Sequence, residues 1–541
     1  MTSSATHDRG LRALLWVGGL LAVIVLNVVS LLRGDLNQDE GWYLYGARLA
    51  AEGQRPYVDF ATTQGPVMTY AYALATPIVR HWGLAGGRLF TSVLGGLAVL
   101  GAAWLAARLA RGDAGNGSAK HAALVAFFLT GVNVFQSYFT TIVKTYALAS
   151  LWLVLAFLLL SAVRGRAGKL APFAAGVCMA LAAGTRITAV IAAGVTMLAL
   201  LAARDIERRA AWARAGWFVG GGALAAGVIF LPFLLAAPEA FWFCLVQYHA
   251  GREVAGWVPW LAYKAGFIAR VCQAYGVAVG VGVTLVCLRW WGAKHTVVGV
   301  AALRPPARAI TDWLGLALWG SVVGISLVHV SAPFPYDDYQ AMIYPLFAVG
   351  LAVALVRRCA AFWAAAAVCA ACLVAAGASP LAQSWFIGAR DRIWWPLKEQ
   401  APLAVLQATA REIAALPGVT PGAEILTQDP YLAVEAGLTL PRGMELGQFC
   451  YFPDWSAARA AANHVLNAEQ LREVLRNSPA PVAAFSGYGF AIRSPEVQRL
   501  AEAEQRALWE LVQTRYQAAN EVTPFGQADT TLRIFVRKPN L

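Results

Sequence analysis

The chain has 541 residues, of which 59% are hydrophobic and 13% are charged. An ordinary soluble domain carries about 25% charged residues, so a wholly soluble protein is excluded. The formal net charge of +13 would suit a nucleic-acid partner. Most Lys and Arg residues, however, stand in short loops between apolar runs, where they report membrane topology. We therefore expect the lipid bilayer, and no nucleic acid, as a partner.

Eleven apolar runs have about the length that crosses a bilayer as a helix. The first follows Arg9 and Arg12 and precedes no small-residue cleavage pattern, so it is expected to be a retained span rather than a signal peptide. A break at 184–186 divides the stretch 170–203 into two spans, although one long helix is the alternative. The expected spans are 11–32, 88–108, 121–139, 146–163, 170–185, 187–203, 214–235, 263–288, 311–331, 340–357 and 360–378.

The loops between these spans alternate in charge, which predicts their orientation. The basic loops are expected in the cytoplasm together with the N-terminus, and the loops rich in Asp and Glu on the outer side. An odd number of spans then places residues from about 379 onward outside. The basic loops are 108–120, 164–169, 204–214, 289–308 and 357–358.

Composition changes after residue 378, where Gln, Glu, Asn and Pro return. Strand-like runs and amphipathic helical patterns alternate there, as in a small α/β domain. The predicted fold class is an α-helical polytopic membrane protein with about 11 transmembrane helices in residues 1–378, followed by an extracytoplasmic α/β domain in residues 379–541. The strand-like runs are 423–427, 482–485 and 532–536, and the helical ones are 397–416, 468–476 and 495–516.

The first outer loop, 33–87, contains the most informative residues. Asp39 can cap a helix that begins beside it, with Glu40 in the first turn. A second amphipathic segment covers 66–78. Two interfacial helices would hold Asp39, Glu40 and Asp59 at the boundary between lipid and water. Simple helix capping by Asp39 is the alternative interpretation.

The pair Asp39-Glu40 after the first span, followed by Tyr-Val-Asp-Phe at 57–60 and Gln-Gly-Pro at 64–66, resembles the GT-C superfamily of membrane glycosyltransferases. The likeness is to the bacterial branch resembling protein O-mannosyltransferases and lipid A aminoarabinose transferases. It covers roughly residues 10–360 and is strongest from 37 to 70. The resemblance implies a hexosyl- or pentosyltransferase of the bacterial cytoplasmic (inner) membrane. Such an enzyme moves a sugar from a polyprenyl-phosphate donor to a cell-envelope acceptor (glycan, lipid or protein) on the outer face.

The resemblance also implies roles for the acidic residues. Asp39 is expected to take the proton of the acceptor, as a general base does. Glu40 is the alternate base or the residue that orients Asp39. Asp59, with Tyr57 and Gln64 beside it, is expected to contact sugar or acceptor, although family members often carry a Lys where this chain has Gln64.

Cations are needed for the charge that grows on the departing phosphate. Arg186 lies inside an apolar stretch, where a charge is costly unless it is paired or functional. The resembling enzymes carry a basic residue at a similar helix break, so we expect Arg186 to bind the phosphate; a snorkelling Arg is the alternative. Lys144 is a second candidate. His249 and Arg252, three residues apart, could grip phosphate or sugar or belong to a solvated loop.

The segment Tyr336-Asp337-Asp338 precedes the tenth span and resembles a loop that closes the active-site cavity in this superfamily. Its acids suit sugar hydroxyls or a divalent cation bound through oxygen, and ordinary loop polarity is the alternative. No cofactor is assigned with certainty and metal use is left open. Lys264 and Arg270 near the start of the eighth span are expected to snorkel.

Two other functions remain open from sequence alone. A transporter or flippase of lipid-linked sugars would often show matched broken helices in two halves, and the long first loop has no later counterpart. A non-catalytic scaffold would leave Asp39, Glu40 and Arg186 without a role. The eight cysteines form no metal-binding pattern, and only Cys244 and Cys450 lie outside spans, where they could pair.

Overall fold

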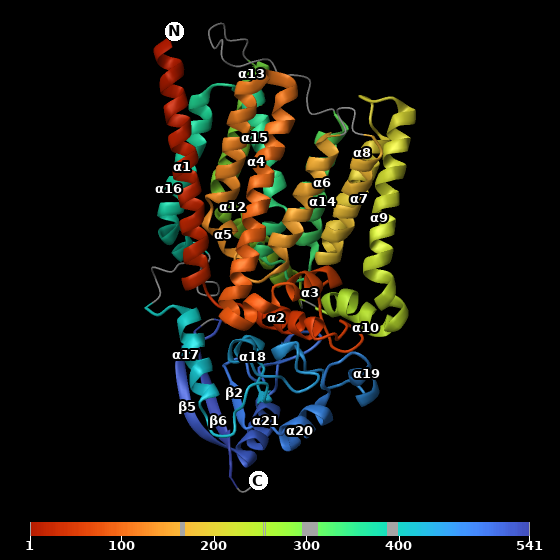
Figure 1. Cartoon of the computed structure of the whole chain (residues 1–541), viewed down its shortest axis with the longest axis vertical. Helices are drawn as coiled ribbons and strands as arrows, with labels where there is room; N and C mark the ends of the chain where they lie inside the picture. Colours follow the sequence, from red (N-terminus) through yellow and green to blue (C-terminus); the bar gives the residue numbers. More distant parts are fainter. Residues whose placement is uncertain are drawn as a thin grey trace.

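Apolar helices make up most of the first 386 residues and stand side by side in one bundle (Figure 1). The computed structural model describes residues 2–162, 168–252, 254, 256–294, 312–386, 399–527 and 529–539. Residues 399–539 form a separate layer at one end of the bundle, and the N-terminus lies at the opposite end. The two ends of the bundle therefore differ, because only one of them is covered by the C-terminal layer.

Six helices within the described residues are long and apolar enough to cross a membrane, or up to seven if the bent pair α12 (Trp257–Ala274) and α13 (Gly276–Lys294) is one span. Exposed apolar side chains such as Leu14 and Val228 cover them, as lipid-facing residues do. The chain is a multi-pass membrane protein, and the count of eleven spans stays a prediction. The six are Arg9–Arg33 of α1 (Thr2–Arg33), Thr76–Arg111 of α4 (Thr76–Gly131), α6 (Thr145–Ala162), α9 (Arg208–Ala236), α14 (Trp313–Ser331) and Phe362–Ser379 of α16 (Phe362–Phe386).

Shorter helices complete the bundle. Two of them, α7 and α8, cover the stretch that the sequence divided at 184–186, and the chain does break there. They are α5 (Val134–Phe139), α7 (Leu170–Thr185), η1 (Ile187–Ala189), α8 (Val190–Leu201), α10 (Pro238–Trp242), η2 (Phe243–Gln247), α11 (Tyr248–Ala250), η3 (Asp337–Met342) and α15 (Tyr344–Arg358).

Helix α4 changes direction twice, although its helical run is unbroken. Gly83 has φ +57, a left-handed value that glycine adopts without strain. A Cβ on Gly86 would lie 2.6 Å from the carbonyl oxygen of Ile78, so the chain turns back at Gly83. Further along, a Cβ on Gly131 would lie 3.0 Å from Val99, although a straight helix would separate these residues by about 48 Å. The second half of α4 therefore packs against the first, which accounts for two expected spans.

The first outer loop contains α2 (Gln38–Ala51) and α3 (Pro66–Ala73). The N-cap of α2 is Asn37, whose side chain accepts from the backbone N–H of Asp39, and Glu40 completes a capping box. The expected cap at Asp39 is therefore wrong: the helix begins two residues earlier, because Asn37 has the extended backbone of a cap. Asp39 stands in the first turn with its carboxylate free for other contacts.

The C-terminal layer, residues 399–539, contains a four-stranded mixed sheet in the order β1-β2-β6-β5, with β1 parallel to β2 and the other pairs antiparallel. Strand β2 occupies the range expected for it, whereas β5 lies where the sequence predicted no strand. The elements are α17 (Pro402–Ala414), β1 (Ile425–Leu426), α18 (Pro430–Ala436), η5 (Gly447–Phe449), α19 (Ala457–Ala462), α20 (Ala468–Asn477), β2 (Val482–Phe485), β3 (Ile492–Arg493), β4 (Gln498–Arg499), α21 (Glu502–Arg515), β5 (Tyr516–Phe525) and β6 (Thr530–Arg537).

One apolar core joins α2 to the C-terminal layer. Leu44 of α2 belongs to the same buried cluster as Leu406 of α17 and Leu432 of α18. The backbones come very close, because a Cβ on Gly41 would lie 2.3 Å from the backbone nitrogen of Tyr431. Helix α2 is thus covered on both faces, by the bundle and by the C-terminal layer (Figure 1), instead of lying on an open membrane surface.

Cys244 and Cys450 are buried in one apolar cluster, and both are free thiols. The pairing that the sequence left open is therefore not made.

Candidate active site

The first feature of the site is a buried ion pair beneath α2. Arg88 of α4 donates to both carboxylate oxygens of Glu40, at 2.6 and 2.8 Å, and both side chains are fully buried. The backbone N–H groups of Asn37 and Val143 donate to the same oxygens at 3.0 and 3.1 Å. A carboxylate with four donors has no oxygen left for an acceptor proton. Glu40 therefore fixes the position of α2, and its neighbour Asp39 points elsewhere.

Asp39 belongs to a chain of alternating charges. The ammonium of Lys144, in the connection between α5 and α6, lies 3.3 Å from Asp39 Oδ2 and 2.6 Å from Asp338 Oδ2. Tyr146 at the start of α6 donates its hydroxyl to the same oxygen of Asp338 at 2.9 Å. The Asp39 side chain is 29% exposed, against 9% for Lys144 and Asp338. Asp39 is thus the one of these three groups that a substrate can reach most readily.

Arg186 stands at the break between α7 and η1. Its guanidinium lies over the rings of Tyr339 and Tyr146, with centroid distances of 4.5 and 5.1 Å. One nitrogen donates to the Thr145 hydroxyl at 3.3 Å, and the buried Nε has no hydrogen-bond partner. Among the residues the structure describes, no carboxylate forms an ion pair with it. An arginine held by aromatic faces and without a counter-ion is prepared to bind an anion.

His249 lies in α11, and Arg252 follows two residues after the end of that helix. The guanidinium of Arg252 lies 5.1 Å from the Tyr248 ring centroid and 5.9 Å from that of Phe449. His249 Nε2 lies 3.0 Å from the carbonyl oxygen of Thr63. Burial, together with the nearby Arg252 and Arg186 charges, lowers the pKa of His249 to about 4. At neutral pH the imidazole therefore carries no charge, and Arg252 alone supplies a cation there.

The segment around η3 closes the site on a third side. Asp337 accepts a hydrogen bond from Arg270 of α12 at 3.0 Å, so this arginine is paired and does not simply snorkel. Burial and the neighbouring Asp338 raise the pKa of Asp337. The Tyr336 ring packs edge-on against that of Tyr339 at 5.6 Å and is 43% exposed. Asp337 is thus held in place by Arg270.

Two of the expected residues, Asp59 and Tyr57, make contacts within the protein in the loop before α3. Asp59 pairs with Arg55 at 3.5 Å on an exposed stretch. Tyr57 is fully buried, packs against Phe233 and Phe241, and donates its hydroxyl to the carbonyl oxygen of Gln64. Gln64 comes nearer to the site, because a Cβ on the next residue, Gly65, would lie 2.1 Å from the carbonyl oxygen of Gly184, two residues before Arg186.

The C-terminal layer contributes one ring to the site. Phe449 of η5 packs edge-on against Trp42 of α2 at 5.2 Å and borders Arg252. Trp42 stands one helical turn after Asp39. The indole nitrogen of Trp42 and the side-chain oxygen of Gln448 are both buried without a hydrogen-bond partner. The aromatic pair of Trp42 and Phe449 therefore lies one helical turn from Asp39, where α2 meets the C-terminal layer.

The described residues contain no group of three or more His, Cys, Asp or Glu that could hold a metal ion. Lys144 lies between the carboxylates of Asp39 and Asp338 and forms an ion pair with each. An ammonium therefore occupies the position that a bridging cation would take between these acids.

Sequence reasoning found Asp39, Lys144, Arg186 and Asp338, which the fold brings together from four segments. It did not find Arg88, Tyr146 or Phe449. Arg88 had a visible signal, since it is a charge at the start of an expected span. Tyr146 and Phe449 had none, because each acts through a partner distant in the chain.

The arrangement of the fold matches solved structures of one superfamily. ArnT from Cupriavidus metallidurans bound to undecaprenyl phosphate, a GT-C lipid A aminoarabinose transferase, superposes with a TM-score of 0.61 at 14% identity, over 97% of this chain and 98% of that one. The same protein in the apo state gives a TM-score of 0.60 at 16% identity, over 96% and 97%. This chain has the fold of the GT-C superfamily.

No protein-family profile and no curated protein sequence matches the chain. The likeness to GT-C proteins is therefore one of fold, and the activity must be argued from the site.

Proposed function

We propose that the protein is a glycosyltransferase that moves a sugar from a polyprenyl-phosphate donor to a cell-envelope acceptor. The observation that carries the proposal is the position of Asp39. Its carboxylate is partly exposed beside Lys144, and Arg186 stands near the same centre among aromatic rings. A base and an unpaired cation in one site suit a reaction in which a hydroxyl loses a proton and a phosphate departs.

The reaction follows from these positions. The acceptor hydroxyl attacks the anomeric carbon of the donor sugar and gives its proton to Asp39. The bond between the anomeric carbon and the phosphate oxygen breaks, and the electron pair leaves with polyprenyl phosphate. Lys144 orients Asp39 through its ion pair, and Asp338, which accepts a hydrogen bond from Tyr146, holds Lys144. Glu40 is held by Arg88, which fixes the first turn of α2 and so positions Asp39.

The departing phosphate gains negative charge, and Arg186 is the residue we assign to it. Arg252 is the second cation on that side, whereas neutral His249 would act as a hydrogen-bond group. The relative with an undecaprenyl phosphate bound supports this class of donor. The acceptor would enter beside Trp42 and Phe449, where aromatic faces can pack against a sugar ring. Tyr336 and the paired Asp337 are further candidates for contacts with sugar hydroxyls.

The test uses purified protein in nanodiscs, a panel of hexosyl and pentosyl polyprenyl phosphates, and a cell-envelope extract as the acceptor. The readout is free polyprenyl phosphate. We expect release from one donor, and a loss of about 10²- to 10⁴-fold in Asp39→Asn, the usual contribution of a general base. The matched control is Asp454→Asn, the same change at a side chain that is 72% exposed in the C-terminal layer.

Release that Asp39→Asn retains would refute Asp39 as the base. If no donor releases polyprenyl phosphate while the protein moves labelled donor across the bilayer, the transferase is refuted and a transporter replaces it.

A further inference from the structure

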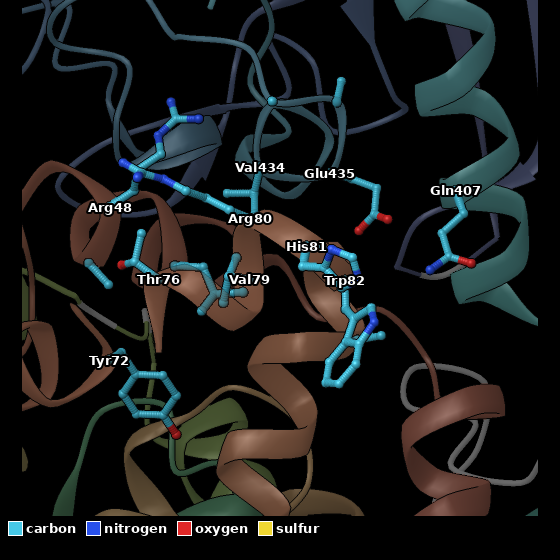
Figure 2. Close-up of a pocket in the computed structure, with 16 residues that line it drawn as sticks. Arg48, Tyr72, Thr76, Val79, Arg80, His81, Trp82, Gln407, Val434 and Glu435 are labelled. Atoms are coloured by element: carbon cyan, nitrogen blue, oxygen red, sulfur yellow. The ribbon is translucent and has the colours of Figure 1, made fainter. Parts of the chain in front are cut away.

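A cavity lies apart from the site of Asp39, at the junction between the bundle and the C-terminal layer (Figure 2). It measures ≈ 490 Å³. Its walls come from the C-terminal half of α2, the end of α3, the start of α4, and helices α17 and α18 of the other layer. The lining residues used below are Arg48, Arg80, Trp82, Ala85, Gln407 and Glu435.

The cavity does not belong to the candidate active site. Arg48 follows Asp39 by nine residues along α2, which amounts to about 13 Å and half a turn around the helix. None of Asp39, Lys144, Arg186 and Asp338 lines the cavity. A ligand in this cavity would therefore not reach Asp39.

The lining is rich in cationic groups that a ligand can engage. The guanidinium of Arg48 lies 4.5 Å from the Tyr45 ring centroid, donates to the carbonyl oxygen of Leu438 at 2.7 Å, and keeps a buried Nε without a partner. Arg80 is 63% exposed and pairs with Glu52 at 3.5 Å, a surface contact that is worth little. Figure 2 shows the two arginine side chains together on one side of the cavity.

The single acid in the lining is already engaged. Glu435 accepts the backbone N–H of Leu84 at 2.7 Å, where α4 resumes after the turn at Gly83. Burial raises the pKa of Glu435, and the contacts with Leu84 and Gln407 oppose that rise. Two guanidinium groups thus face one carboxylate that is tied to the backbone, so the cavity favours an anion.

The cavity continues into a lipid-facing surface. Ala85 lines the cavity, and Leu89, Val93 and Leu97 follow it at four-residue steps along α4, with exposures of 40, 55 and 48%. Such residues form one ridge of a helix, here about 18 Å long from Ala85. Trp82 in the cavity wall is 51% exposed, and Trp prefers the level of the lipid headgroups.

We propose that this cavity binds the phosphate-bearing headgroup of an anionic membrane lipid, whose acyl chain lies along the ridge of Leu89, Val93 and Leu97. The headgroup contacts Arg48 and Arg80. Because Gln407 and Glu435 come from the C-terminal layer, the bound lipid joins that layer to the bundle. The inference does not depend on the proposed transferase activity.

The test compares phosphatidylglycerol, phosphatidylcholine and inorganic phosphate, each titrated into delipidated protein in detergent and counted by native mass spectrometry. We expect phosphatidylglycerol to bind more tightly than phosphatidylcholine. Arg80→Gln should weaken phosphatidylglycerol roughly fivefold, the effect of one basic residue near anionic lipid. The matched control is Arg533→Gln, which removes an exposed arginine paired with Glu521 at 3.1 Å on the far strands of the C-terminal layer.

A second readout does not rely on the Arg80 variant. Brominated phosphatidylglycerol should quench tryptophan fluorescence more in the native chain than in Trp82→Phe, and unlabelled phosphatidylglycerol should relieve that difference. Equal binding of both phospholipids would overturn the proposal, and so would quenching that Trp82→Phe leaves unchanged. Binding of inorganic phosphate at Arg80 without binding of the lipids would overturn it as well.

Discussion

The two neighbouring carboxylates at the start of α2 differ in burial and in their partners. Glu40 has no exposed surface and is held by Arg88, while Asp39 keeps an exposed fraction of 29%. The two residues are adjacent in sequence, so their side chains point about 100° apart around the helix. One therefore points into the bundle and the other into the site. The sequence showed the acidic pair but not which member would be buried.

The same conservative change should separate the two roles. Glu40→Gln leaves Arg88 as a buried charge without a counter-ion, so we expect a loss of about 3–5 kcal/mol in the free energy of unfolding. Asp39→Asn should change stability by no more than about 1 kcal/mol, because Lys144 keeps Asp338 as its partner. The same change should lower turnover about 10²- to 10⁴-fold. Thermal unfolding in detergent, read beside the release assay, measures both. Equal stability of the two variants would contradict the structural role of Glu40.

The ammonium of Lys144 lies between the carboxylates of Asp39 and Asp338, 3.3 and 2.6 Å from their Oδ2 atoms. We therefore expect turnover to survive exhaustive chelation with EDTA. Lys144→Met should lower turnover at least about 10²-fold, because it leaves two carboxylates together without the ammonium that orients Asp39. Activity that disappears with EDTA and returns with Mg²⁺ or Mn²⁺ would show instead that a metal ion shares the site with Lys144.

Because the pKa of His249 is lowered by burial, we expect the stability of the fold to decrease in acid. The folded protein holds His249 with a pKa of about 4, below its usual 6.5, because of burial. The unfolded chain then binds more protons between those values, so stability is lost as pH falls from about 6.5 toward 4, by up to about 3 kcal/mol. Chemical unfolding across this range should show that slope, and His249→Gln should flatten it. If the slope of stability against pH is unchanged in the variant, groups other than His249 cause it.

At the scale of elements, sequence periodicity located helices well and their bends poorly. Helix α7 has the bounds that the apolar pattern predicts, and α14 differs by two residues. The expected span 263–288 is instead two helices that meet at 91°. The bend lies at Tyr275, whose hydroxyl donates to Gln136 and whose ring stacks on Tyr344 at 3.8 Å. These partners are far away in sequence, so no local pattern reports them.

Strand β5 was missed for a different reason. Between its buried ends at Tyr516 and Phe525, most residues are exposed, so no alternation of polar and apolar residues marks it as a strand. It pairs only with β6 at the edge of the sheet, with two register shifts along the pair. An exposed edge strand of this kind gives a weak sequence signal, and the sequence therefore predicted no strand over these residues.

The contact between α2 and α18 gives a prediction about glycine. A Cβ on Gly41 would meet the backbone nitrogen of Tyr431 at 2.3 Å, and backbone cannot move aside cheaply. Gly41→Ala should therefore cost about 1–3 kcal/mol of stability, as overpacking does. The control is Gly96→Ala on α4, where nothing lies within 4 Å. Thermal unfolding measures both, and equal midpoints would mean that the layers separate more readily than their packing indicates.

At the scale of the molecule, the two ends of the bundle predict the topology in the membrane. The N-terminus and the start of α9 lie at the end away from the C-terminal layer (Figure 1), which agrees with the basic loops being cytoplasmic. We propose that the C-terminal layer is extracytoplasmic. In intact cells a membrane-impermeant maleimide should label Asp454→Cys but not Arg209→Cys, both at exposed positions. Labelling of Arg209→Cys alone would show that the chain has the opposite orientation in the membrane.

The closure of α2 between the two layers also limits how such proteins can be recombined. The helix that carries Asp39 shares its core with Leu406 and Leu432, and Arg48 donates to a backbone carbonyl of the C-terminal layer. A chimera joined at residue 379 would therefore pair one protein's α2 with another's α18. In a working chimera, the first outer loop, 33–87, and the C-terminal layer must come from the same protein, although some 300 residues separate them in the chain.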